Sequence, residues 1–240
     1  MDGDTLDFDT FKELVHVSKK EMYREFFRRH RERIKVKKEP VAIRNLIRIS
    51  EATLDLSNRK GFSAMSMRDL STASGLSMGA LYSYFSSKDD LLDMIQEESL
   101  ALATRVLTTR IGNARDPHLK LKQAIVAHLY LSEEMHPWFY FSFMETKNLK
   151  KSARRKAIEI ELFIERIFID IIEAGQRTGV FRQINGKLAA GMIKALLQDW
   201  YLKKWKYDQR HVALEAYAGF LLDVVDAYLL AQPKKNGGGE

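Results

Sequence analysis

The chain has 240 residues, 45% of them hydrophobic, with four prolines and no cysteine, which excludes a disulfide scaffold, a zinc-thiolate site and a mostly disordered chain. Its 39 Lys/Arg and 32 Asp/Glu give a net charge of +7, but residues 19–60 alone hold 14 basic and six acidic side chains, so the remainder is close to neutral. A local basic surplus favours an anionic partner, either nucleic acid or an anionic membrane surface.

The amino terminus, MDGDTLDFDT, is acidic and lacks the basic start and apolar run of a signal peptide. No apolar stretch reaches the roughly 18 to 20 residues that a membrane span needs, because Asp223 and Asp226 interrupt even GFLLDVVDAYLL. We therefore expect a soluble, cytoplasmic protein.

Residues 1–40 form an extension whose charge changes sign along the chain. Aspartates dominate its first nine positions, and basic clusters follow at residues 19–20 and 28–31. Apolar residues recur loosely between Phe11 and Ile34, which predicts a helix that docks at least in part. Three roles stay open for the basic residues: a solvated face, supplementary phosphate contacts, or binding to a membrane surface.

The next predicted helix lies between Val41 and Lys60, where apolar residues recur three, four and seven apart. Gly61 follows a basic last turn, as the end of a helix prefers. A short helix should start after Ser66, because Ser66 and Asp69 have the spacing of a capping box.

That short helix should turn Leu70 and Ala73 inward and end at Gly75 in the left-handed conformation. Ser77 then caps a second short helix that runs to Phe85. Two short helices joined by a glycine turn form a helix-turn-helix. Small residues at the start of the second helix allow its backbone to approach a surface closely.

The rest of the chain carries apolar residues at helical spacing, and no segment has a convincing strand pattern. The fold class is therefore all-α. The run at residues 138–143, WFYFSF, is aromatic all round, so it either packs in the core or lines a cavity. The tail at residues 233–240 should be disordered. Further helices are predicted at residues 87–110, 117–135, 138–149, 152–176, 187–206 and 211–231.

The stretch GFSAMSMRDLSTASGLSMGALYSYFSSKDDLL, residues 61–92, resembles the DNA-binding domain of the TetR family of bacterial transcriptional regulators. The matching features are the glycine after the first helix and the groups RDL, GLS, GALY and YF-SSK in fixed register. The resemblance implies a three-helix helix-turn-helix domain at residues 41–95 and a helical ligand-binding and dimerisation domain at residues 96–232, behind the extension at 1–40.

Carried over position by position, the resemblance implies two kinds of DNA contact. Phosphate contacts fall on Ser66, Tyr82, Tyr84 and Lys88, and base-edge contacts fall on Arg68, Ser77, Met78, Ala80 and Ser83. The second short helix has no Arg, Asn or Gln, the usual bidentate readers of bases, so Arg68 is the best candidate for reading a guanine. DNA shape would carry part of the remaining specificity.

The carboxy-terminal domain is expected to hold a ligand and a dimer interface. The candidate ligand residues are His128, Trp138, Phe141, Glu145 and Phe168, although a lone histidine is more often a satisfied core residue. Small residues in the last two helices permit close helix approach, and the predicted interface comprises Gly191, Met192, Ala195, Leu196, Leu221 and Val225. The family arrangement implies a two-fold dimer on a palindromic operator, with half-sites about 34 to 36 Å apart.

The sequence therefore predicts a ligand-responsive, homodimeric repressor of transcription that binds double-stranded DNA and needs no cofactor or metal. METKNL, GVFRQ and LLQDWYLKKWKY also resemble TetR-type repressors of lipid metabolism, which favours an acyl-coenzyme A effector ahead of flat aromatic drugs or a quorum signal. An architectural DNA-binding protein without an effector is an alternative. An enzyme has little support, because the chain has no HExxH motif and its six histidines are scattered.

Overall fold

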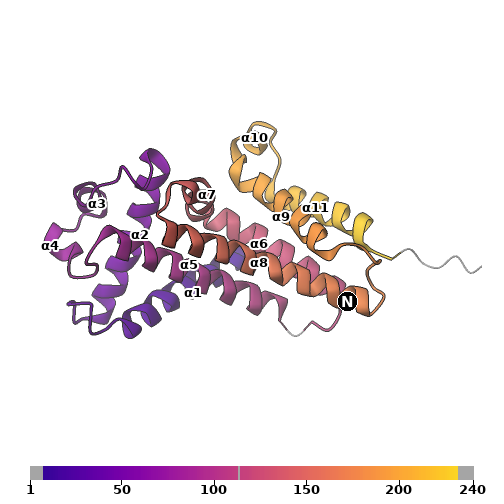
Figure 1. Ribbon diagram of the computed structural model, residues 1–240, viewed down its shortest axis with the longest axis horizontal. Helices are drawn as coiled ribbons and strands as arrows, with labels where there is room; N and C mark the ends of the chain where they lie inside the picture. Colours follow the sequence, from indigo (N-terminus) through magenta and orange to yellow (C-terminus); the bar gives the residue numbers. More distant parts are fainter. Residues whose placement is uncertain (1–7, 113, 232–240) are drawn as a thin grey trace, which may run out of the picture. The chain divides into compact units, whose positions relative to one another are not determined.

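The computed structural model describes residues 8–112 and 114–231 of the chain (Figure 1). The expected disordered tail at residues 233–240 lies outside this range. Apart from one antiparallel bridge between Phe181 and Leu230, all regular secondary structure in the described residues is helical, which confirms the all-α prediction. None of the described helices is long and apolar enough to cross a membrane.

The bounds of the helices follow the predicted ones closely in most of the chain. In chain order they are α1 (Phe8–Arg29), α2 (Glu39–Lys60), α3 (Met67–Ser74), α4 (Met78–Leu81), α5 (Lys88–Ile111), α6 (Pro117–Glu134), α7 (His136–Glu145), the 3-10 helix η1 (Thr146–Asn148), α8 (Lys151–Arg177), α9 (Gly186–Leu202), α10 (Lys204–Gln209) and α11 (Leu214–Leu229).

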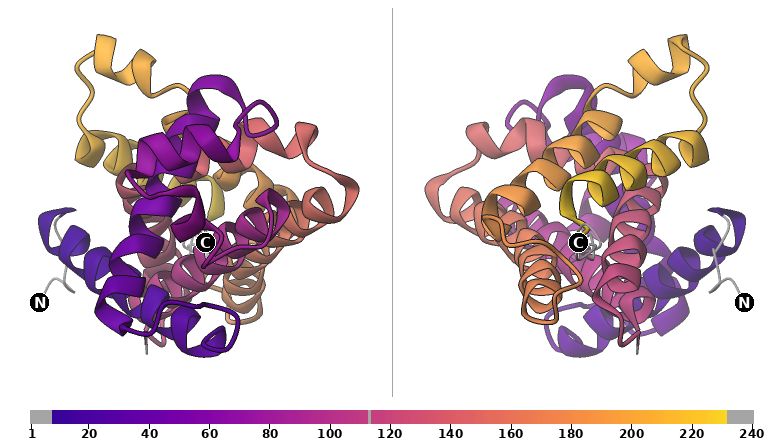
Figure 2. Two further views of the ribbon diagram at one scale, coloured as in Figure 1. Left: turned by 90° about the vertical axis from the view of Figure 1, so that its left-hand side faces the viewer. Right: turned by 90° about the vertical axis from the view of Figure 1, so that its right-hand side faces the viewer.

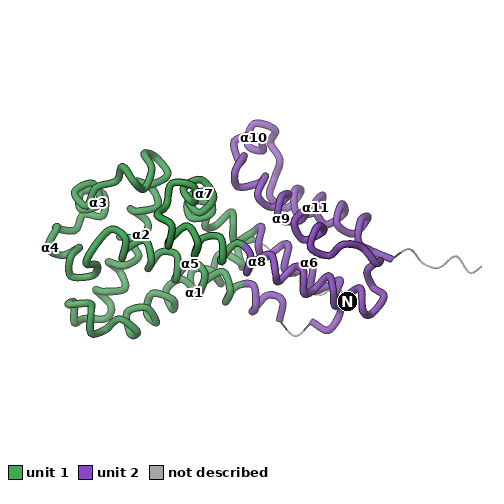
Figure 3. The backbone as a smooth tube through the Cα atoms, in the orientation of Figure 1, with its two compact units in different colours: residues 1–106, 130–161 green, residues 107–129, 162–240 purple. Residues whose placement is uncertain are grey.

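The helices form two compact units (Figure 3). Of the described residues, unit 1 contains residues 8–106 and 130–161, and unit 2 contains residues 107–112, 114–129 and 162–231. These units differ from the expected domains at 41–95 and 96–232, because α5, α6 and α8 each contribute to both units. The expected functional division stays a prediction.

In unit 1, the extension is helical from Phe8 and docks through one apolar face, as its loose apolar stripe predicts. Phe11 and Phe27 are almost completely buried. Phe8 and Phe11 meet the ring of Tyr130 edge-on, with centroids 5.2 and 5.5 Å apart. The extension is therefore an integral part of the hydrophobic core of unit 1.

Two ion pairs attach α1 to α5. Arg105 donates to both carboxylate oxygens of Glu25 at 2.7 Å, and Arg29 donates to Glu98 Oε1 at 2.6 Å. Glu98 is only 2% exposed, and this burial raises its pKa to about 7 even though Arg29 acts in the opposite direction. The Glu98 Oε2 atom has no hydrogen-bond partner among the described residues. The Glu98 carboxyl therefore binds a proton more tightly in the folded protein than in the unfolded chain.

In unit 2, the segment that follows α8 pairs with the end of α11. Phe181 is 1% exposed and lies against Gly175, where an added Cβ would come within 2.1 Å of the phenylalanine ring. Arg182 N donates to Leu229 O at 3.0 Å, beside the bridge between Phe181 and Leu230. The glycine in α8 thus makes room for the side chain that anchors this bridge.

The expected helix at residues 187–206 ends early, at Leu202, and α10 follows as a separate short helix. In both views of Figure 2, the connection from α9 to α11 forms an outlying loop of unit 2. The carboxylate of Asp199 accepts hydrogen bonds from Lys203, Lys206 and Tyr207. Burial alone would raise the pKa of Asp199, but these three donors hold it well below its usual range. The carboxylate thus gathers the residues that follow it and stabilises the change of direction.

Candidate nucleic-acid interface

The helix-turn-helix begins at the capping box of α3, as predicted. Ser66 Oγ accepts from Asp69 N at 3.1 Å, and Ser66 N donates to Asp69 Oδ2 at 2.7 Å. Hydrogen bonds from Lys60 and then from Ser66 hold the pKa of Asp69 well below its usual range. The ion pair between Lys60 and Asp69 at 2.6 Å ties the start of α3 to the end of α2. The Asp69 carboxylate of the capping box is therefore charged at neutral pH and is held in place by Lys60 and Ser66.

The turn between the two short helices also has the predicted geometry. Gly75 has φ +64° and ends α3 in the left-handed region, which a residue with a side chain rarely adopts. Leu70 is buried as expected, but the expected inward position of Ala73 is wrong, because Ala73 is exposed and Ser74 is buried in its place. Helix α3 thus faces the core through Leu70 and Ser74, which lie four positions apart.

The second short helix, α4, is shorter than predicted. Ser77 Oγ accepts from Ala80 N at 3.1 Å, but the helix ends at Leu81 and residues 82–84 form a turn. Leu81 and the following Phe85 still pack into the core, at 0% and 3% exposure. An added Cβ at Gly79 would meet nothing within 4 Å. The outer face of α4 is therefore open to a large partner.

Most of the predicted DNA contacts lie on accessible positions of this motif. Arg68 is exposed and makes no ion pair with any described residue, and Tyr82 is 47% exposed. Ser66 and Ser77 are exposed, although both hydroxyls serve as helix caps. The positions of intermediate exposure are Met78, Ala80 and Ser83.

The structure gives Tyr84 a different environment from the one that a phosphate contact needs. Tyr84 is only 5% exposed, and its hydroxyl accepts a hydrogen bond from Asn45 Nδ2 at 2.9 Å. Burial raises the pKa of Tyr84, so the phenol stays neutral. In this conformation the Tyr84 side chain packs the helix-turn-helix at residues 66–85, which we call the reading motif, against α2.

Lys88 is likewise engaged within the protein. Its ammonium donates to the backbone carbonyls of Phe62, Ser63 and Met65 at 2.7, 3.0 and 3.0 Å. An ammonium has three N–H donors, so these bonds use all of them. Burial lowers the pKa of Lys88. Lys88 therefore fixes the loop between α2 and α3, and a phosphate contact would require it to leave these partners.

Sequence reasoning missed a direct link between this loop and α7. Asn58 Nδ2 donates to Pro137 O at 2.6 Å, and Phe62 N donates to Glu145 Oε2 at 3.2 Å. The rings of Phe62 and Phe141 meet edge-on with centroids 6.0 Å apart. About 80 residues separate the partners along the chain, so no local pattern signals the contact. The last turn of α2 is thus attached to the start of α7 through Asn58, and the loop after α2 is attached to its end through Phe62.

The five predicted ligand residues fall into two groups. In unit 2, His128 and Phe168 are buried neighbours, with ring centroids 6.1 Å apart. Burial, followed by the nearby charge of Lys194, lowers the pKa of His128 well below its usual value. The Lys194 Nζ atom lies 3.3 Å from His128 Nε2. This buried polar pair thus lies inside unit 2, and a role in ligand binding stays a prediction.

The other predicted ligand residues belong to unit 1. Phe141 and Glu145 are buried and contact the Phe62 loop described above. Trp138 is 6% exposed and lines a groove of about 640 Å³ together with residues of α1 and α2. Within unit 1, the aromatic run on α7 therefore serves mainly as packing, although Phe143 is 49% exposed.

The predicted dimer residues on α9 and α11 also divide by exposure. Ala195 is exposed, and Gly191, Met192 and Leu196 have intermediate exposure. Leu221 and Val225 are each only 1% exposed and pack inside unit 2, so a partner cannot reach their side chains. The accessible face of α11 carries Phe220 at 60% exposure instead, and α9 carries Leu188 at 72%.

Two family models match separate segments of the chain. A family model described as bacterial regulatory proteins of the tetR family matches residues 49–95, and one described as a tetracyclin repressor-like C-terminal domain matches residues 114–225. The HTH-type transcriptional regulator HbdR of Aromatoleum sp. (strain CIB) is 24% identical over 186 residues, which is 78% of this chain and 81% of HbdR.

Solved structures show the same fold. The ketosteroid transcriptional regulator KstR2 of Mycobacterium tuberculosis superposes with a TM-score of 0.68 at 16% identity, over 78% of this chain and 95% of that chain. The transcriptional regulator FadR of Bacillus subtilis, solved in complex with stearoyl-CoA, superposes with a TM-score of 0.63 at 20% identity, over 75% of this chain and 96% of that chain.

Proposed function

The chain belongs to the TetR family of bacterial transcriptional regulators, and from this membership we propose that it is a homodimeric repressor, released from a palindromic operator by a hydrophobic effector. It is a DNA-binding regulator and not an enzyme. We propose the palindromic form of the operator, the two-fold dimer and the hydrophobic effector.

The observation that carries the proposal is the open outer face of the helix-turn-helix. Arg68 and Tyr82 are accessible there, and Gly79 leaves the backbone of α4 uncovered. In a helix-turn-helix protein, this is the face that enters the major groove of DNA. We expect Arg68 and the first turn of α4 to contact base edges, with Tyr82 on a phosphate.

The exposed faces of α9 and α11 support a two-fold dimer. Leu188, Met192 and Ala195 recur four and three apart on α9, and Gly219 and Phe220 lie on the accessible side of α11. Large apolar side chains this exposed on adjacent helices are typical of an interface. A two-fold dimer presents two reading motifs, so the operator should be a palindrome with half-sites about 34 to 36 Å apart.

The leading effector class is an acyl-coenzyme A thioester, supported by the likeness to FadR of Bacillus subtilis, which was solved with stearoyl-CoA. The likeness to KstR2 makes a steroid the second candidate. The link from α7 to Asn58 and Phe62 offers a route by which a displaced α7 would move the reading motif. Such coupling requires the effector to bind the DNA-free conformation more tightly.

The test is selection of duplexes from a random-sequence pool by the purified full-length protein, followed by titration of the selected duplex with stearoyl-CoA. We expect an enriched palindrome and a lower affinity in the presence of the thioester. Absence of any enriched sequence would refute the regulatory function. Enrichment without a thioester effect would remove the acyl-CoA assignment and leave a steroid or an effector-free DNA-binding protein.

A further inference from the structure

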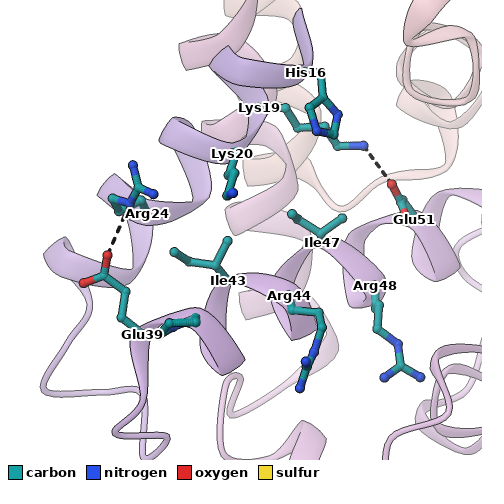
Figure 4. A pocket seen from close by; sticks show the side chains of 11 residues that line it. His16, Lys19, Lys20, Arg24, Glu39, Ile43, Arg44, Ile47, Arg48 and Glu51 are labelled. Carbon is teal, nitrogen blue, oxygen red and sulfur yellow. Dashed lines mark hydrogen bonds and ion pairs between the residues drawn. The ribbon is translucent and has the colours of Figure 1, made fainter. Parts of the chain in front are cut away.

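A basic groove of about 570 Å³ lies between α1 and α2 in unit 1 (Figure 4). At its two ends the cations are paired: Arg24 Nε lies 3.3 Å from Glu39, and Lys19 Nζ lies 2.8 Å from Glu51. These pairs join α1 to α2 and leave the central part of the groove without an acidic side chain.

Three further cations of the groove have no such partner. Lys20, Arg44 and Arg48 are exposed, and none of them makes an ion pair or a side-chain hydrogen bond with a described residue. Figure 4 shows Lys20 between the two helices, and Arg44 and Arg48 pointing away from α1. Cations on one surface repel one another when no acidic side chain pairs with them, and a bound anion relieves this repulsion.

Of these cations, Arg48 lies beside the reading motif. An added Cβ at Gly75 would come within 2.7 Å of Arg48 Nη2, so the Arg48 guanidinium lies against the turn of the helix-turn-helix. The connector from α1 to α2 approaches the same motif, because Lys35 N donates to Ser83 O at 3.0 Å. Lys37 and Lys38 follow in this connector. All three connector lysines are exposed and form no ion pair among the described residues.

We propose that these six cations form an accessory phosphate-binding surface for the DNA backbone that flanks each operator half-site. We call it the connector surface, and it consists of Lys20, Lys35, Lys37, Lys38, Arg44 and Arg48. The inference rests on the proposed function, which places DNA against the outer face of α4. The proposal assigns these accessory phosphate contacts to the extension and to α2, and leaves sequence reading to Arg68 and α4.

Placement and chemistry favour DNA over other anionic partners. Arg48 and Lys35 lie at the turn and at the end of the reading motif, so a duplex seated on that motif passes close to them. A membrane-binding helix needs an exposed apolar face. Among the described side chains before Tyr82, no large apolar residue is exposed. The surface is therefore cationic without the apolar anchor that a membrane requires.

The expected signature is the dependence of DNA affinity on salt. Each phosphate that a protein contacts on duplex DNA changes the slope of log K against log salt concentration by about 0.9. The contacts should appear only when the duplex extends past the half-sites. Phosphate contacts of this kind contribute affinity but little choice of sequence.

The test compares full-length wild type with the variant Lys35→Gln/Lys37→Gln/Lys38→Gln on the selected duplex, either trimmed to the palindrome or extended by one helical turn on each side. A second variant, Lys20→Gln/Arg44→Gln, tests the groove itself. The matched control is Arg177→Gln/Lys187→Gln/Arg210→Gln, which removes three exposed cations of unit 2. Circular dichroism and thermal melting check that every variant is folded.

We expect the wild-type slope to be steeper on the extended duplex than on the trimmed one. Both surface variants should lose about one unit of slope per contact removed on the extended duplex, while the control keeps the wild-type slope. Equal slopes for wild type and both surface variants would overturn the connector surface and leave the proposed function intact. Failure of wild type to prefer any sequence would instead refute the proposed function. Retention on phosphatidylglycerol vesicles with unchanged DNA slopes would assign the surface to a membrane.

Discussion

At the residue scale, the helix-turn-helix could be predicted wherever the decisive contacts are local. The capping box of Ser66 and Asp69, the left-handed Gly75 and the cap at Ser77 each depend on residues at most three positions apart. The environments of Tyr84 and Lys88 could not be predicted in this way. Their partners, Asn45 and the carbonyls from Phe62 to Met65, lie 23 to 39 residues away and become neighbours only when α2 packs.

Arg68 provides the residue-scale prediction. Replacement by Ala should relax the preference at one position of the operator half-site and cost about 1 to 3 kcal/mol of binding free energy on the preferred sequence. The reason is that its exposed guanidinium is free to form two hydrogen bonds to a guanine. The measurement is binding to duplexes mutated singly at each position.

The matched control for Arg68 is Arg177→Ala, which removes an exposed arginine of α8 far along the sequence from the motif. The control should bind all duplexes as wild type does. An equal loss of affinity on every duplex for Arg68→Ala would instead make Arg68 a phosphate contact.

At the element scale, the spacing of apolar residues predicts the ends of most helices to within a few residues, because each helix has an apolar face that is visible in its own sequence. The break between α9 and α10 was missed. At this break the carboxylate of Asp199 accepts hydrogen bonds from Lys203, Lys206 and Tyr207, and the last two contacts form only once the chain has turned. The helical nature of α1 could be predicted, but the two ion pairs that attach it to α5, one of them to the buried Glu98, could not.

The attachment of α1 predicts a pH dependence of stability. The folded pKa of Glu98 is about 7, above its unfolded value of 4.5. The associated stability is therefore fully present below about pH 4.5 and is lost as the pH rises through 7. A shift of this size corresponds to on the order of 3 kcal/mol in the free energy of unfolding.

Urea denaturation at pH 5.5 and pH 8 measures this contribution. The Glu98→Gln variant carries a permanently neutral side chain, so it should lose less stability than wild type between these two values. The difference between the two proteins isolates Glu98 from all other titrating groups. Equal pH dependence in wild type and variant would show that Glu98 has an ordinary pKa.

At the scale of the whole molecule, the family resemblance predicts the order of the DNA-binding and ligand-binding domains along the chain. The compact units of the structure have different boundaries from these predicted domains. The helix-turn-helix shares unit 1 with α7 and with the extension. The apolar stripe of the extension predicts that it docks but not against which segments. The association with α7 has no signal in the sequence, since its contacts join segments that are far apart along the chain. The described part of the extension, from residue 8 onward, thus belongs to the hydrophobic core of unit 1.

Dimerisation is the prediction at this scale. Gly219 lies on the accessible side of α11, and an added Cβ there would meet nothing within 4 Å in the single chain. Gly219→Leu should therefore leave the fold intact but raise the dimer dissociation constant by roughly tenfold or more, because a large side chain separates closely packed helices.

Sedimentation equilibrium provides the measurement for Gly219→Leu, and Arg177→Leu serves as the control for an added leucine on another exposed helix position. Only the α11 variant should dissociate. An unchanged dimer in Gly219→Leu would place the interface on another surface.

The central claim is that the outer face of α4 enters the DNA groove, and Gly79→Leu tests it most directly. The free protein has room for this side chain, so the variant should melt as wild type does. The measurement is the ratio of affinities for the selected duplex and for a scrambled duplex at one salt concentration. In wild type we expect a ratio of about 10³ or more, and in Gly79→Leu a ratio close to one. A folded Gly79→Leu protein that keeps the wild-type ratio would contradict the account.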